Sequence, residues 1–76
     1  MARAPAITGT DAIRALRRAG FEVARIAGSH HMLVHSVDSS RRVVVPVHKG
    51  KDLKRGTVRA IVRAAGLTPE EFQELL

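Results

Sequence analysis

Apolar residues at helical spacing predict a helix near the start of the chain. We expect Thr10 to be its N-cap, with Asp11 in the first turn and Gly20 at its end. The apolar face of this helix consists of Ala12, Ile13, Leu16 and Ala19. Residues 1–9 lack such spacing and are predicted to form a short arm.

Two more helices are predicted in the last third of the chain. One begins at about Arg55 and runs to Ala65, where Gly66 ends it, and its apolar face consists of Val58, Ile61, Val62 and Ala65. In the other, Thr68 is the expected N-cap, and Glu71 completes a capping box after a proline at the first helical position. This short helix should cover an edge of the core with Phe72, Leu75 and Leu76.

Between the helices, alternating and β-branched segments predict three strands, at residues 21–26, 30–37 and 41–47. Pro46 has no N–H to donate, so the third strand should end there or lie at a sheet edge. The order α-β-β-β-α-α predicts an α+β domain, in which helices cover one face of a three-stranded antiparallel sheet. Double-stranded-RNA-binding domains have a similar arrangement.

The length of 76 residues predicts a single domain, residues 1–76, without a large internal cavity. The chain has no cysteine, which favours a cytoplasmic protein without disulfides. It also has no apolar run of membrane-spanning length and no recognisable signal peptide, so we expect no membrane association.

Positive charge is concentrated before the last helix. The net charge is +6, but residues 1–67 carry all 13 Lys and Arg and only 4 of the 7 acidic residues, a net of 13 − 4 = +9. Such an excess on a small domain favours a polyanionic partner, most simply a nucleic acid. The alternative is a solvated basic surface without a specific partner.

Two adjacent histidines follow a predicted turn at Gly28-Ser29. Because side chains alternate along a strand, His30 and His31 must point to opposite faces of the sheet. If Leu33 faces the core, His30 points away from it, whereas the reverse holds if the neighbours of Leu33 are buried. The outward histidine is the candidate reactive group, and the inward one is expected to be structural.

A histidine beside a basic surface is the minimum for RNA cleavage. An imidazole can accept the proton of the 2′-hydroxyl or donate one to the leaving 5′ oxygen, while cations offset charge on the phosphate. Adjacent histidines diverge, so neither a metal site nor another cofactor is expected. The expected phosphate contacts lie in the loop after the third strand and at the start of the next helix: Lys49, Lys51, Lys54, Arg55 and Arg59.

From Ile7 onward the chain resembles the HicA (YcfA-like) family of messenger RNA interferase toxins. The resemblance rests on short motifs in a fixed order: Ile7-Thr8-Gly9, the segment 16–21 (LRRAGF), the Gly28–His31 turn, the segment 41–48 (RRVVVPVH) and the segment 53–58 (LKRGTV). It implies the double-stranded-RNA-binding fold and metal-independent RNA cleavage. The catalytic histidine of the family corresponds to His30, presented by Gly28 and supported by His31. The family commonly has an aromatic residue where this chain has Leu33.

The resemblance also implies partners. A HicB-like antitoxin would cover the active face, and DNA would be contacted only through the antitoxin complex. Two alternatives remain on sequence grounds: a non-catalytic RNA-binding module, and a ribosomal or nucleoid accessory protein that shares only the charge.

Overall fold

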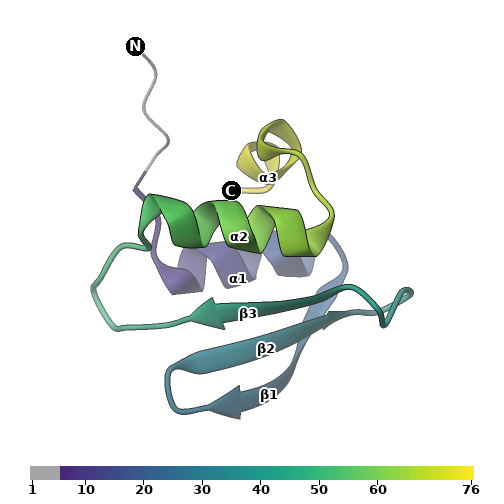
Figure 1. Cartoon of the computed structure of the whole chain (residues 1–76), viewed down its shortest axis with the longest axis horizontal. Coiled ribbons are helices and arrows are strands. Elements are labelled where there is room, and N and C mark those ends of the chain that lie inside the picture. The colour runs from purple at the N-terminus through teal and green to yellow at the C-terminus, as the bar shows by residue number, and fades with distance from the viewer. Residues whose placement is uncertain (1–5) are drawn as a thin grey trace.

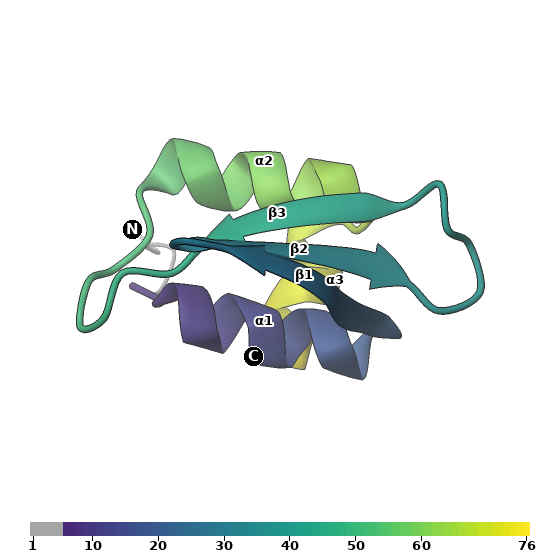
Figure 2. The same ribbon diagram turned by 90° about the horizontal axis from the view of Figure 1, so that it is seen from below.

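The computed structural model describes residues 6–76, so most of the predicted arm lies outside the described residues. The elements follow the predicted α-β-β-β-α-α order: α1 (Gly9–Arg18), β1 (Phe21–Ala27), β2 (His30–His35), β3 (Arg42–Pro46), α2 (Arg55–Ala65) and α3 (Pro69–Leu75). The strands form one antiparallel sheet in the order β1-β2-β3. Helices α1 and α2 lie side by side on one face of this sheet (Figure 1), and the view from below shows the other face uncovered (Figure 2). The α+β prediction is confirmed.

Helix α1 begins two residues earlier than predicted. Its N-cap is Thr8, not Thr10, because the Thr8 hydroxyl accepts the backbone N–H of Asp11 and the Asp11 carboxylate accepts that of Thr8. These hydrogen bonds, the backbone one most strongly, lower the pKa of Asp11 from its ordinary value of 3.8. The expected arm is therefore helical already from Gly9.

Gly9 is fixed by a close approach between α1 and the end of β3. A Cβ at this position would collide with the carbonyl oxygen of Pro46 and lie 3.0 Å from the Cα of Val47. Neither of these backbone atoms can move without shifting the strand. Because Gly9 has no side chain, the start of α1 can pack directly on the backbone at the end of β3.

Gly9→Ala is expected to lower the free energy of unfolding by about 1–3 kcal/mol, because the added methyl group forces α1 away from β3. Urea denaturation measures this loss. Gly56→Ala is the matched control, since Gly56 also lies in the first helical turn, with no atom within 4 Å of its Cβ position. That variant should be neutral or gain up to about 1 kcal/mol, and equal losses in both variants would contradict the packing argument.

Strand β2 ends at His35, two residues before the predicted end at residue 37. The Nδ1 atom of His35 accepts the backbone N–H groups of Val37 at 3.2 Å and Asp38 at 3.1 Å, which turns the chain out of the sheet. The Asp38 carboxylate accepts hydrogen bonds from the side chain and backbone of Ser40, and these lower the pKa of Asp38. This local network closes the β2–β3 loop.

Arg41, predicted to begin the third strand, instead connects the sheet to α2. Its guanidinium group donates two hydrogen bonds to the carbonyl oxygen of Ala65, the last residue of α2, and lies 5.4 Å from the ring centroid of Phe21. A cation is favourable at this end of a helix. Helix α2 itself has the predicted bounds and ends at Gly66, which adopts a φ of +72°.

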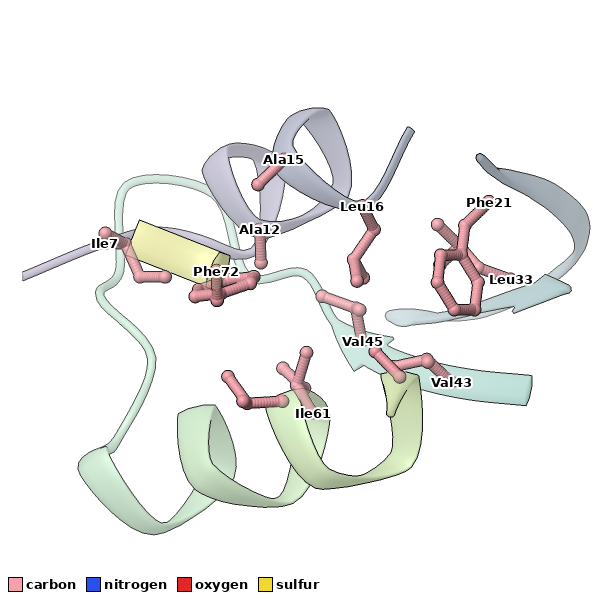
Figure 3. Packing of buried hydrophobic residues seen from close by; sticks show 12 residues of the cluster. Ile7, Ala12, Ala15, Leu16, Phe21, Leu33, Val43, Val45, Ile61 and Phe72 are labelled. Atoms are coloured by element: carbon pink, nitrogen blue, oxygen red, sulfur yellow. The ribbon is translucent and has the colours of Figure 1, made fainter. Parts of the chain in front are cut away.

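The core lies between the sheet and the helices. Figure 3 shows Leu16 of α1, Val45 of β3 and Ile61 of α2 converging, with Phe72 of α3 closing one side. Phe72 is buried and Leu75 packs against the core, as predicted, whereas Leu76 is exposed. The helices therefore cover β2 and β3 on one face, whereas β1 is exposed beyond its first residue, and the other face of the sheet is uncovered.

Candidate active site

A two-residue turn places His30 at one end of the central strand. Gly28 and Ser29 connect Ala27 of β1 to His30 of β2, which are paired residues. Gly28 has a φ of +58° and Ser29 does not have a positive φ, the pattern of a type II′ hairpin turn with glycine first. Any other residue at Gly28 would be strained, although the space around its Cβ position is open.

The burial of Leu33 decides which histidine faces outward. Leu33 is fully buried against the helices, so His31 shares its face and His30 lies on the uncovered face. His30 is exposed and is paired with Ala27 on one side and Pro46 on the other. Of the two alternatives that the sequence leaves open, the structure has the one with Leu33 in the core.

His31 takes part in local packing rather than in the same surface. It is half-buried opposite Val45, and its Nδ1 atom lies 3.5 Å from the carbonyl oxygen of Ser29, a separation at the limit of a hydrogen bond. The same carbonyl oxygen accepts the backbone N–H of Val47 at 2.7 Å. His31 thus lies beneath the turn that presents His30, and the two imidazoles do not meet on one face.

The basic loop, residues 48–54, leaves the sheet at the same end as His30 (Figure 1). It starts just beyond Pro46, the partner of His30, and runs to the N-terminus of α2. The N–H of Leu53 donates to the carbonyl oxygen of Ile7 at 2.7 Å, and Asp52 forms a β-bridge with Thr8. The loop is therefore continuous with β3 at its start and hydrogen-bonded to the segment before α1 near its end.

The five predicted phosphate contacts are exposed at this end of the molecule or along the first turns of α2. They are Lys49, Lys51, Lys54, Arg55 and Arg59. Among residues 6–76 none of these five cations forms an ion pair with a side-chain carboxylate, although the loop itself contains Asp52. An uncompensated, solvated group of cations suits a polyanion.

The uncovered face of the sheet is apolar next to His30. Met32 and Val34 follow His30 on β2 with their side chains on the same face, and Val44 of β3, which is 47% exposed, lies opposite Met32. Arg25 and Arg42 are exposed on the flanking strands. This surface can receive a base, a sugar or a protein partner.

Leu33 takes no part in ligand binding, since it is buried on the other face. An aromatic residue there would pack in the core and could not stack on a base from the open face. The departure from the usual family residue therefore does not alter the candidate site.

The part of the chain that the structure describes contains no group of three or more His, Asp or Glu residues able to hold a metal ion. In that same part, no helix has the length and apolarity to cross a membrane. The site consists of an imidazole, backbone groups and cations, which can transfer protons and bind phosphate.

Sequence reasoning misses two residues near this site. The sequence predicts Gly9 in an arm and His48 only as part of the basic loop. For His48 a usable signal exists, because it stands two residues after Pro46 and strand alternation predicts its face. For Gly9 no such signal exists, because its role depends on a tertiary contact with the backbone of Pro46.

Comparison with known proteins gives one family. A family model described as HicA toxin of bacterial toxin-antitoxin matches residues 9–67, from the start of α1 to just beyond α2. The matched region contains the turn, all three strands and the basic loop. A search of curated proteins gives no match.

Proposed function

Because the chain belongs to the HicA toxin family of bacterial toxin–antitoxin systems, we propose that it is a toxin that cleaves messenger RNA without a metal ion. The observation that carries the proposal is an exposed imidazole, His30, on the uncovered face of the sheet, beside a basic loop whose lysines form no ion pair among the described residues. RNA supplies its own nucleophile, so proton transfer and phosphate binding are the two tasks left to the protein.

In the proposed reaction the 2′-hydroxyl oxygen attacks the adjacent phosphorus while its proton passes to a base. The bond from phosphorus to the 5′ oxygen breaks, and that oxygen takes a proton from an acid. The products are a 2′,3′-cyclic phosphate and a 5′-hydroxyl end, so no water, metal or cofactor is consumed. His30 transfers one of these protons, and Gly28 and His31 hold the turn in place.

Lys49, Lys51, Lys54, Arg55 and Arg59 bind the phosphates that flank the cleaved bond. Their charges attract the strand and offset the negative charge that develops on the phosphate during the reaction. These side chains are exposed and form no ion pair with a carboxylate in the described chain. RNA can therefore bind them without breaking an internal ion pair.

The family implies an antitoxin partner. We propose that a HicB-like antitoxin covers the open face with His30, Met32 and Val44, and that DNA contacts occur only through the resulting complex. The supporting features are the uncovered apolar surface next to the imidazole and the surrounding positive charge, which fits an acidic protein surface.

The test is incubation of the purified protein with a long unstructured RNA in EDTA, followed by gel analysis and identification of the product ends. We expect cleavage with 2′,3′-cyclic phosphate and 5′-hydroxyl ends. Saturable binding without cleavage would replace the nuclease by a non-catalytic RNA-binding module. Binding that depends steeply on salt, with no preference for RNA over DNA, would indicate an accessory protein that shares only the charge.

A further inference from the structure

His48 lies on the extension of β3, beside the turn that carries His30. His30 is paired with Pro46, and the next residue, Val47, donates its backbone N–H to the carbonyl oxygen of Ser29 at 2.7 Å. The antiparallel pairing therefore continues for one residue beyond the strand. His48 follows directly, at the position diagonal to His30.

Alternation along β3 places His48 on the open face. Val43 and Val45 are buried, and Val47 packs against the same core, so these three point toward the helices. Val44 and Pro46 point the other way, and the same alternation, continued through the hydrogen bond of Val47 to Ser29, puts His48 on the side of Val44. His48 is exposed, and its carbonyl oxygen accepts the N–H of Lys51 at 2.9 Å, which fixes the backbone on its far side.

We propose that His48 is the second catalytic residue, acting with His30 as an acid–base pair on the two sides of one phosphate. This inference rests on the proposed function. Diagonal neighbours on an antiparallel pair of strands have Cα atoms about 7–8 Å apart. Two imidazoles at that spacing can each reach one oxygen of a phosphodiester held between them by hydrogen bonds of about 2.6–3.2 Å.

The chemistry requires two groups. The attacking 2′ oxygen and the leaving 5′ oxygen lie on opposite sides of the phosphorus, so one histidine cannot accept the first proton and donate the second in the same displacement. One imidazole takes the 2′-hydroxyl proton as the P–O2′ bond forms, and the other gives its proton to the 5′ oxygen as the P–O5′ bond breaks. The protonation states are then exchanged, and solvent restores them.

The other histidines do not fit the second role. His31 points to the opposite face of the sheet. His35 lies at the far end of β2, where its ring packs edge-on against Phe21 at 5.0 Å and its Nδ1 atom is occupied by two backbone N–H groups. Of the three other histidines, only His48 lies at the same end and on the same face of the sheet as His30.

The experiment compares the parent protein with His30→Ala, His48→Ala and Lys49→Ala on an oligonucleotide that the parent cuts at one mapped site. We expect His48→Ala to lower the rate at saturating RNA by about 10²–10⁴-fold, with a change in Kd of less than about threefold. Lys49→Ala, the neighbouring variant, should raise Kd more than His48→Ala does and lower the saturated rate less, because it removes a phosphate-binding charge without removing a proton carrier.

A second substrate has sulfur in place of the 5′ oxygen at the same site. Thiolate leaves without protonation, so this substrate should restore cleavage to only one of the two histidine variants, the one that lacks the acid. A His48→Ala protein that cuts within threefold of the parent, or a loss explained by Kd alone, would overturn the proposal. So would restoration of both variants or of neither. If the parent itself does not cut, the nuclease function fails, and the acid–base pair fails with it.

Discussion

Replacing His30 by alanine is expected to abolish RNA cleavage, with a fall in rate of about 10²–10⁴-fold or more, while the fold and RNA affinity remain close to those of the parent. The imidazole is exposed at the start of β2 and has no hydrogen-bond partner among the described residues, so the core loses nothing with it. The measurements are cleavage of an unstructured RNA in EDTA, urea denaturation, and RNA binding by fluorescence anisotropy.

His31→Ala is the matched control for this prediction, since it deletes the same side chain one residue further along. The half-buried His31 lies under the turn and opposite Val45, so its loss should lower stability and reduce cleavage by loosening the turn, without removing a proton carrier. Cleavage should therefore exceed that of His30→Ala. If His30→Ala instead unfolds the protein while His31→Ala cuts normally, the assignment of His30 to the open face is wrong.

The elements that sequence predicts well are those whose signals are local. The capping box of Thr68 and Glu71 satisfies backbone groups within four residues, so α3 begins where the sequence places it. The apolar stripe of α2 and Gly66 after it likewise define that helix. Each of these signals acts through neighbouring residues and does not depend on the rest of the fold.

The start of α1 combines a local signal with a tertiary contact. Thr8 and Thr10 are both suitable N-caps, and both could precede Asp11. Thr8 stands three residues before Asp11, the spacing of a capping box, and Gly9 in addition packs on the backbone of Pro46, 37 residues later in the numbering (46 − 9 = 37). A contact over that separation leaves no mark in the local pattern.

The candidate site was predictable in its composition but not in its orientation. Met32, Leu33 and Val34 are all apolar, so the sequence alone cannot decide which of them faces the helices. The structure decides it by burying Leu33 opposite Val43. An irregularity between Val23 and Arg25 in β1, which no residue pattern signals, also changes the faces along the edge strand.

The anchoring of the basic loop could not be read from the sequence either. A segment with two glycines and four basic residues between 48 and 56 reads as a solvated loop. Its bonds to Ile7 and Thr8 join it to the segment before α1 and set the cations beside the turn of His30. The position of the loop thus depends on its contact with the segment before α1, and neither segment shows this contact in its own sequence.

The double change Lys54→Ala and Arg55→Ala is expected to weaken RNA binding and to flatten its dependence on salt. Each phosphate contact to a single strand contributes about 0.7 to the slope of log K against log salt concentration, so losing two contacts should reduce the slope by about 1.4. Lys54 is the N-cap residue of α2, but its side chain makes no capping hydrogen bond, and both side chains are exposed. The fold should therefore survive the change.

The control removes two arginines from α1, as Arg14→Ala and Arg17→Ala, and so produces the same change in net charge away from the basic loop. If cations bind phosphate where the loop presents them, the control should keep most of the parent slope. An equal reduction in both double variants would mean that RNA responds to overall charge, or that the exposed face of α1 also binds phosphate. Unchanged affinity after loss of Lys54 and Arg55 would remove the start of α2 from the site and leave phosphate binding to the lysines of the preceding loop.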